Sequence, residues 1–411
     1  MRVALIVAGA GPMYCGACSR DVAMSRLLSS LGHEVSIYPV YTPLKLEDGD
    51  GLPLRPLSFG GIGAYLRDTI GWSWSWLDHP RLVQWATGFA IQTHPRDLAR
   101  MTVSVLKGTN GRHGREMERT AHLVAESSPD VVILPNSMLA CMAPALKRQT
   151  KARIVCQVQG EDGFIEELPE PWRSEAISLI RKAAPSVDGF VAPSKGYSER
   201  MRAFLEIDAC SVVAHPVVPD LLPSPLESPL TIGCLSSIRR AKGLDRLVEA
   251  MRFLPEMRLL VAGRTLEPAF EQQVRATAPP NVQFLGELSP SQKREFYGRC
   301  DLVCLPSRLH ESRAIAALEA LSHGRPVVAS AQGFFTELAT FTPAVVTVDA
   351  EDPRLLSEAI LNLADRPKLS WLGREGCESL CMRFSPHRIG IELNRLLQAE
   401  STAVASSGDR A

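Results

Sequence analysis

The stretch DLVCLPSRLHESRAIAALEALSHGRPVVAS, residues 301–330, combines two short apolar runs with a helical pattern between them. The first run predicts a buried strand ending near Ser307, and RPVVAS predicts a second. Between them we expect a helix over 313–322, with Ser312 as its N-cap and Gly324 just beyond its end. Continuous apolar strands joined by a helix are typical of a parallel sheet covered on both faces.

The same alternation of apolar runs and helical patterns occurs along most of the chain. It is seen in VALIVAG, HEVSIYPV, DVVILP and RIVCQVQ, and again in LTIGCLSS and MRLLVAG. A chain of 411 residues is also too long for one hydrophobic core. The sequence therefore predicts an α/β protein with two doubly wound, Rossmann-like domains facing across a cleft.

The proline-rich segment HPVVPDLLPSPLESPL has no helical or strand periodicity, which places the domain boundary there. The C-terminal tail of the chain, AESTAVASSGDRA, lacks large apolar residues and is expected to be disordered. The predicted parts are an acceptor-side domain over 1–215, a linker over 216–229, a donor-binding domain over 230–385, a helix over 386–400 that can cross back to the first domain, and a disordered tail over 401–411.

Charge and composition exclude several classes of protein. Lys plus Arg and Asp plus Glu both number 45, so no overall field attracts nucleic acid, and no nucleic-acid partner is expected. The cysteines do not have the spacing of a four-ligand zinc site, and a chain of this size needs no disulfides. With no apolar run long enough for a signal peptide or a membrane span, we expect a cytoplasmic protein.

Two glutamates within the opening stretch are the first candidates for a site. Glu311 lies beyond the carboxyl end of a predicted strand, where open α/β sheets bind ligands, and Glu319 lies on the following helix. Taken alone, Glu311 is explained as a residue that caps a turn, and Glu319 as a solvated residue of a helix. The cations Arg239, Arg240 and Lys242 follow the first strand of the same domain, where they are well placed to hold an anion.

With these motifs the sequence resembles the GT-B glycosyltransferases of retaining family 4, the glycosyl transferases group 1. The resemblance is strongest over 281–340, where two glutamates separated by seven residues precede a small-Gly-x-Pro-Val segment. It implies a nucleotide-sugar donor and transfer with retention. It further implies that Glu319 binds the ribose hydroxyls, Glu311 faces the donor sugar and Lys242 the diphosphate. Gly16 matches the glycine loop that approaches the phosphates.

The sequence departs from the family pattern at three positions. Ser237 stands where the family has an arginine five positions before the lysine, and Arg239 or Arg240 is expected to substitute for it. Ala314 stands where a glycine follows the first glutamate, and its methyl group can crowd the donor phosphate, although alanine costs nothing to a helix. Cys15 replaces the first glycine of the N-terminal loop.

Two further motifs suggest a metal or a redox pair, and neither is favoured. Asp48 and Asp50 form a D-x-D in a glycine-rich loop of the first domain, where a solvated turn explains them better. Cys15 and Cys18 form a C-x-x-C inside the glycine loop, with no motif that supports thiol exchange. We therefore expect no cofactor and no metal.

The acceptor side is less well defined. Glu161 and Asp162 follow the strand ending at QVQ and are expected in a loop, where either orients an acceptor hydroxyl or Asp162 stabilises a turn. The segment 71–93 holds four of the six tryptophans. It is expected to be a packed lobe on the acceptor side, or else a peripheral contact with the inner face of a membrane or with a lipid-linked acceptor.

These features together favour a retaining glycosyltransferase that moves a sugar from a nucleotide-activated donor to a glycan, lipid-linked or small-molecule acceptor. A nucleotide-sugar epimerase on the same fold is one alternative, and it would release nucleotide without an acceptor. A degenerate protein that binds a nucleotide or glycan without catalysis is another, because Ser237 and Ala314 depart from the family pattern.

Overall fold

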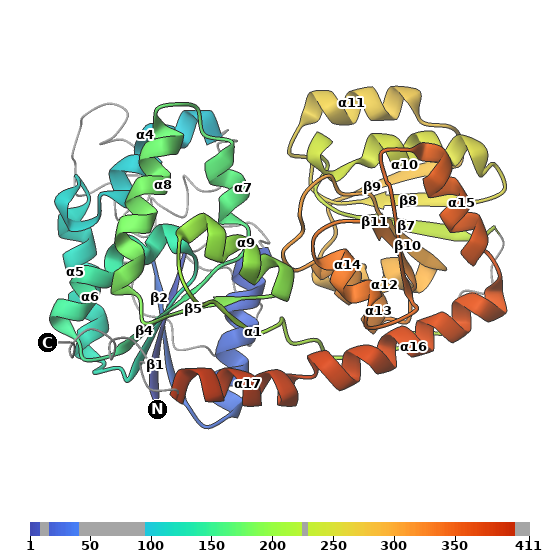
Figure 1. Cartoon of the computed structure of the whole chain (residues 1–411). Coiled ribbons are helices and arrows are strands. Elements are labelled where there is room, and N and C mark those ends of the chain that lie inside the picture. The colour runs from blue at the N-terminus through green and yellow to red at the C-terminus, as the bar shows by residue number, and fades with distance from the viewer. Residues whose placement is uncertain (9–15, 41–94, 224–228, 399–411) are drawn as a thin grey trace, which may run out of the picture. The chain divides into compact units, whose positions relative to one another are not determined.

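A computed structural model of the chain describes residues 1–8, 16–40, 95–223 and 229–398. The chain divides into two compact units (Figure 1), and each is described by itself. Unit 1 comprises Met1–Val213 with the chain from Gly390 onward, and unit 2 comprises Ala214–Ile389. Asp48, Asp50, Cys15, the segment 71–93 and the tail over 401–411 lie outside the described residues. Within the described ranges, no helix is long and apolar enough to cross a lipid bilayer.

Unit 1 is built on a parallel six-stranded sheet in the order β2-β1-β3-β4-β5-β6. Each of the first five strands is almost entirely buried, because helices flank the sheet and continuous apolar runs can face them on both sides. The strands are β1 (Arg2–Val7), β2 (Glu34–Pro39), β3 (Val131–Leu134), β4 (Arg153–Gln157), β5 (Gly189–Ala192) and β6 (Ser211–Val212).

Unit 1 also includes most of the last helix of the chain, from Gly390 onward. On α17, a Cβ at Gly390 would lie 3.2 Å from both terminal methyl groups of Leu31, and the Arg153 guanidinium donates to the carbonyl of Leu396. The helices are α1 (Gly16–Ser30), α4 (Pro95–Leu106), η2 (Gly108–Asn110), α5 (Gly114–Glu126), η3 (Ser137–Met142), α6 (Ala143–Gln149), α7 (Glu161–Glu166), α8 (Trp172–Ala183), η4 (Ala184–Ser186), α9 (Lys195–Leu205) and α17 (Pro386–Gln398).

Unit 2 has a second parallel sheet of six strands in the order β12-β11-β10-β7-β8-β9. The strands are β7 (Thr231–Leu235), β8 (Arg258–Ala262), β9 (Val282–Gly286), β10 (Leu302–Leu305), β11 (Val327–Ser330) and β12 (Val345–Val348). The helices are η5 (Arg240–Lys242), α10 (Leu244–Ala250), η6 (Met251–Phe253), α11 (Pro268–Thr277), α12 (Pro290–Arg299), α13 (Ile315–Ser322), α14 (Phe334–Ala339), α15 (Pro353–Leu363) and α16 (Arg366–Phe384).

Two parallel sheets with flanking helices, each with its own hydrophobic core, confirm the predicted α/β architecture of two doubly wound units (Figure 1). The proline-rich segment bonds to unit 2, since Val217 N–H donates to Phe384 O at 2.8 Å and Asp220 N–H to Ser322 O at 3.0 Å. These bonds to unit 2 give backbone N–H groups of the extended, proline-rich segment the acceptors that a helix or sheet would otherwise provide.

Three local predictions were wrong. Helix α13 begins at Ile315 rather than at residue 313, and its N-cap is Ala314, not Ser312. Ala314 is left-handed, with φ of 45° and ψ of 47°, so the alanine lies outside the helix and carries a conformational cost. Glu161 and Asp162 form the first turn of α7 instead of a loop.

Candidate active site

The candidate site lies in unit 2, where the chain leaves the carboxyl ends of β7 and β10. The two loops approach closely at Gly243, whose φ is +69°, because a Cβ there would lie 1.9 Å from the carbonyl oxygen of Pro306. No other residue type fits such a contact in a left-handed conformation. This glycine brings η5, the turn that carries Lys242, against the end of β10.

Lys242 and Glu311 meet at the centre of this arrangement. Lys242 Nζ lies 2.5 Å from Glu311 Oε1, and the two side chains are only 17% and 20% exposed. The two residues are far apart in the sequence, and the structure brings them together at one edge of the sheet. A partly buried pair of this kind places an ammonium group and a carboxylate where a ligand can exchange with either one.

Ser307 holds Glu311 from the other side, and the sequence did not single it out. Its hydroxyl donates to Glu311 Oε1 at 2.7 Å and accepts from Leu309 N–H at 3.2 Å. Its carbonyl oxygen accepts from the Ser330 hydroxyl and the Gln332 amide, both at 2.6 Å. The position of Ser307 directly after a buried strand is a sequence signal that could have indicated a site residue. That signal does not indicate its partners Ser330, on β11, and Gln332.

The backbone of Glu311 is fixed by the segment that follows β11. Phe334 N–H donates to Glu311 O at 2.8 Å. Gly333, with φ of +60°, comes so close that a Cβ there would lie 2.6 Å from Glu311 N. Side chain and backbone of Glu311 are therefore both held by neighbours.

Glu319, on α13, is likewise held by a hydroxyl group and an ammonium group. On α12, Lys293 Nζ lies 2.8 Å from Glu319 Oε1, and the Tyr297 hydroxyl donates to Oε2 at 3.0 Å. Burial, followed by the negative charge of Glu319, raises the pKa of Tyr297 well above its ordinary value, so the phenol remains a donor. Glu319 is 30% exposed, which is less than expected of a solvated helical residue.

The two arginines near Lys242 differ in their surroundings. Arg240 faces α11: its Nη2 donates to Gln273 Oε1 at 3.3 Å, and its guanidinium lies 5.0 Å from the ring centroid of Phe270. The Nε of Arg239 is buried and has no hydrogen-bond partner among the described residues. Of the two, Arg239 is better suited to replace the cation that Ser237 removes, because Arg240 is already engaged.

Ala314 shapes the amino end of α13. It is 4% exposed, and its carbonyl accepts from Ala317 N–H at 2.8 Å and Leu318 N–H at 3.1 Å. The N–H groups of Ile315 and Ala316 belong to the first turn, whose donors have no partner within the helix. Together with the positive end of the helix dipole, such groups favour an anion in front of Ala314.

The predicted site residues of unit 1 have other surroundings. Glu161 is 5% exposed, and its two oxygens accept from Ser137 N–H at 2.8 Å and Gln159 N–H at 2.6 Å. Asp162 accepts from the Tyr197 hydroxyl at 2.6 Å and pairs with Arg200. Their role toward an acceptor stays a prediction.

Gly16 is the first residue of α1, at the amino end of the first helix of unit 1. Residues 9–15, which form the rest of the glycine loop, lie outside the described part of the chain. The approach of this loop to a phosphate therefore also stays a prediction.

Comparison with known protein families connects this site with sugar transfer. Residues 229–366, which hold Lys242, Glu311 and Glu319, match the family model for glycosyl transferases group 1. This match covers most of unit 2 and confirms the resemblance to glycosyl transferases group 1 that the opening stretch indicates. Membership of family 4 and retention of configuration are separate questions.

Curated relatives match over part of their length. The lipopolysaccharide core biosynthesis mannosyltransferase LpsB of Rhizobium meliloti is 30% identical over 168 residues, which is 38% of this chain and 47% of the relative. The D-inositol 3-phosphate glycosyltransferase of Xylanimonas cellulosilytica is 28% identical over 224 residues, which is 52% of each chain. The chain thus spans about half the length of these relatives.

Solved structures match the fold over almost the whole chain. Sucrose-phosphate synthase from Thermosynechococcus elongatus has a TM-score of 0.72 at 16% identity, covering 96% of this chain and 98% of that one. Anabaena Alr3699/HepE, crystallised with UDP and glucose, has a TM-score of 0.68 at 14% identity, covering 97% and 100%. These likenesses confirm the predicted GT-B fold.

Proposed function

We propose that the protein is a retaining glycosyltransferase that moves a sugar from a nucleotide-activated donor to a glycan, lipid-linked or small-molecule acceptor. The observation that carries the proposal is the Lys242–Glu311 pair at the carboxyl ends of β7 and β10. Glu319 follows on the next helix, inside the segment that matches glycosyl transferases group 1. The names of the relatives, a mannosyltransferase and an inositol phosphate glycosyltransferase, support the same class of reaction.

The donor's diphosphate would occupy the space between Lys242 and the amino end of α13. In the reaction, the bond between the anomeric carbon and the leaving phosphate oxygen breaks. The acceptor oxygen bonds to that carbon from the same face, and the acceptor hydroxyl gives its proton to the departing phosphate. The anomeric centre becomes oxocarbenium-like while negative charge develops on the phosphate. Lys242, Arg239 and the N–H groups after Ala314 stabilise that charge.

The two glutamates would bind hydroxyl groups at the two ends of the donor. When phosphate takes the ammonium group of Lys242, the carboxylate of Glu311 becomes available to the sugar hydroxyls. Glu319 accepts from the ribose hydroxyls, with Tyr297 and Lys293 fixing its carboxylate. Each carboxylate is thus oriented before the donor arrives, which lowers the entropic cost of binding.

We also propose that the reaction needs no divalent metal, because Lys242 and the helix dipole supply positive charge where a metal would otherwise act. The enzyme should retain its transfer rate in EDTA. A loss of turnover in EDTA that Mg²⁺ or Mn²⁺ restores would show that this part of the proposal is wrong.

Incubation with UDP-, GDP- and ADP-sugars and a panel of acceptors tests the reaction itself. Transfer to an acceptor with unchanged anomeric configuration, read by NMR, is the expected result. Epimerised sugar with no acceptor product would identify the epimerase, and tight nucleotide binding with no turnover would identify a binding protein. Neither alternative is favoured here, since the matching family and the named relatives are glycosyltransferases.

A further inference from the structure

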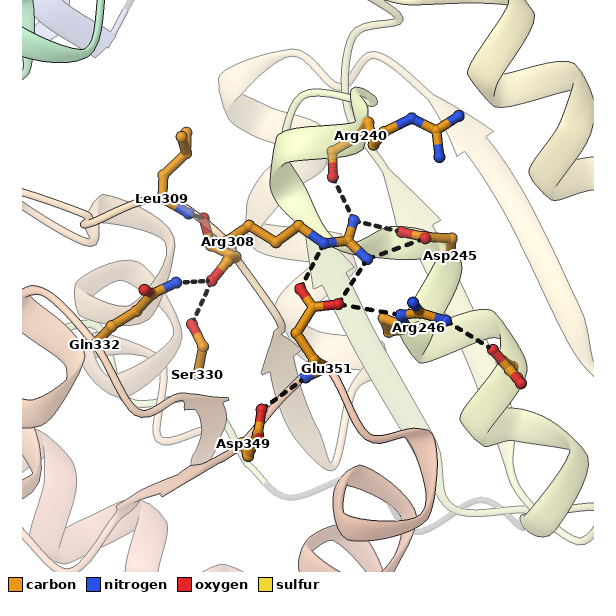
Figure 2. A network of polar contacts seen from close by, with 11 residues as sticks. Arg240, Asp245, Arg246, Arg308, Leu309, Ser330, Gln332, Asp349 and Glu351 are labelled. Carbon is orange, nitrogen blue, oxygen red and sulfur yellow. Dashed lines mark hydrogen bonds and ion pairs between the residues drawn. The ribbon is translucent and has the colours of Figure 1, made fainter. Parts of the chain in front are cut away.

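A polar network surrounds Arg308 beside the candidate site (Figure 2). Arg308 directly follows Ser307 in the loop after β10, and its side chain is 24% exposed. It connects three segments that leave the carboxyl ends of different strands. These are its own loop, the η5–α10 segment after β7, and the turn at Glu351 after β12.

Every N–H of the Arg308 guanidinium has an acceptor within the protein. A guanidinium has five N–H donors in a planar fork. Nε donates to Glu351 Oε1 at 2.5 Å; Nη1 donates to Arg240 O at 2.6 Å and Asp245 Oδ1 at 2.8 Å; Nη2 donates to Asp245 Oδ2 at 3.1 Å and Glu351 Oε2 at 3.2 Å. Arg308 is therefore a support for its neighbours and has no donor left for a substrate.

The contacts of Arg308 concentrate on the turn that carries Lys242. Its side chain donates to the carbonyl of Arg240, and its backbone N–H donates to the carbonyl of Ala241 at 2.9 Å. These are the two residues before Lys242. Ser307, the residue before Arg308, holds the carboxylate of Glu311 at 2.7 Å. The dipeptide Ser307–Arg308 thus supports both members of the Lys242–Glu311 pair.

From this geometry we infer that Arg308 is a positioning residue for the transfer reaction. It fixes η5, through the Arg240 carbonyl, Asp245 and Glu351, so that the Lys242 ammonium group lies where the leaving diphosphate must be met. The inference rests on the proposed function. It adds a residue that never touches the donor but sets the place of one that does.

The two carboxylates of the network remain charged at neutral pH, which keeps the fork closed. Burial is the largest single effect on Asp245 and opposes its ionisation, but the hydrogen bonds and charge of Arg308, together with the smaller effects of a backbone hydrogen bond and Arg246, lower its pKa overall. The hydrogen bonds from Arg308 are the main cause of the lowered pKa of Glu351. Arg246 also donates to Glu351, at 3.2 Å, but among the described residues its side-chain hydrogen bonds and ion pairs go to Glu351 and Glu249, not to η5.

Arg246 therefore offers a matched control for the loss of one positive charge. Arg308→Gln and Arg246→Gln remove equal charge from the same network, but only the first releases the Arg240 carbonyl. A charge-conserving variant adds a second comparison, because Arg308→Lys keeps the charge but its three N–H donors on one nitrogen cannot replace the five hydrogen bonds of the planar guanidinium.

The test is calorimetric titration with UDP, GDP and ADP, using whichever binds the parent. The proteins are the two Gln variants, Arg308→Lys, Lys242→Ala, Glu319→Ala and the double variant Lys242→Ala/Arg308→Gln. We expect Arg308→Gln and Arg308→Lys each to weaken binding about tenfold, and Arg246→Gln to change it less than about threefold. In the Lys242→Ala background, Arg308→Gln should have almost no further effect, because a positioning residue acts through the lysine.

Several outcomes overturn the inference. They are an equal loss for Arg308→Gln with and without Lys242, an equal loss for Arg246→Gln, full binding by Arg308→Lys, and no loss for Arg308→Gln. If Arg308→Gln does not fold, Asp245→Asn replaces it in the same cycle, since it loosens the fork while keeping the arginine. Unchanged diphosphate binding in both Lys242→Ala and Glu319→Ala is a different result, which would overturn the proposed donor site itself.

Discussion

Each unit has two candidate acidic side chains that follow a strand of its parallel sheet. They are Glu161 and Asp162 in unit 1 and Glu311 and Glu319 in unit 2, and the two pairs differ in their contacts. In unit 1, the four carboxylate oxygens of Glu161 and Asp162 all accept hydrogen bonds from nearby segments of the same unit. In unit 2, Lys242 and Ser307 both contact Oε1 of Glu311, and nothing in the described residues donates to its Oε2.

Exposure differs in the same direction. The side chain of Asp162 is 6% exposed, whereas those of Glu311 and Glu319 are 20% and 30% exposed. A buried acid with both oxygens occupied stabilises the framework, because removing a partner leaves an uncompensated charge. An acid that its neighbours orient but leave partly exposed, as they do Glu311 and Glu319, can bind a hydroxyl-rich ligand. Exposure therefore favours Glu311 and Glu319 over Glu161 and Asp162 as candidate ligand-binding acids.

The largest effect is expected where the comparison assigns chemistry. Lys242→Ala should lower kcat by about a hundredfold or more, because it removes a charged donor facing the leaving phosphate. The melting temperature should change little. Steady-state transfer kinetics check this, with Lys368→Ala, an exposed lysine on α16, as the control. Equal losses in both variants would point to a non-specific effect of charge.

The next effect concerns the structural acids of unit 1. Asp162→Ala should lower the free energy of unfolding by about 3 kcal/mol, because it removes the acceptor of the buried Tyr197 hydroxyl and one of the two carboxylates that pair with Arg200. Urea denaturation followed by circular dichroism measures this change. Loss of transfer activity with unchanged stability would instead give Asp162 the acceptor-side role that the sequence suggested.

A smaller effect is expected at the second glutamate of unit 2. Glu319→Gln should weaken nucleoside diphosphate binding about tenfold, because a neutral amide replaces a charge-assisted acceptor for the ribose hydroxyls. Titration calorimetry gives the dissociation constants, and Glu358→Gln, an exposed position on α15, serves as the control. Binding at the parent's affinity would return Glu319 to the role of a structural helix residue.

The smallest effect is expected at Ala314. Replacement by glycine should raise the free energy of unfolding by about 0.5 kcal/mol, because relief of the left-handed strain slightly exceeds the extra entropy of the unfolded chain. Thermal unfolding of Ala314→Gly against the parent measures the difference. A destabilised variant would mean that the contacts of the buried methyl group outweigh its strain.

The sequence predicted the sheets better than it predicted the contacts that hold the candidate site residues. Continuous apolar runs such as VALIVAG and DLVCLPS favour buried strands, and a signature of two glutamates with a distant lysine selected Glu311, Glu319 and Lys242 as candidates. The supports were missed because they come from segments distant in sequence. Tyr297 reaches Glu319 from α12, and Arg308 joins three separate loops.

The start of α13 shows why local rules also failed. Ser312 has the right chemistry for an N-cap, and a helix from residue 313 is locally reasonable. Tertiary contacts decide otherwise, because Phe334 and Gly333 hold the backbone of Glu311 and the chain must then turn at Ala314 before the helix can begin. No pattern within ten residues contains that constraint.

The most direct test of the donor site in unit 2 is a thermal-shift titration with UDP, GDP and ADP of the parent, Lys242→Ala, Glu319→Ala and Asp162→Asn. A ligand with a dissociation constant of ~10 μM, supplied at ~1 mM, stabilises the folded protein by ~2.7 kcal/mol, which is a resolvable shift. We predict that one nucleotide shifts the parent and Asp162→Asn equally, and shifts Lys242→Ala and Glu319→Ala much less. Equal shifts in all four proteins, or a shift lost only in Asp162→Asn, would contradict the account.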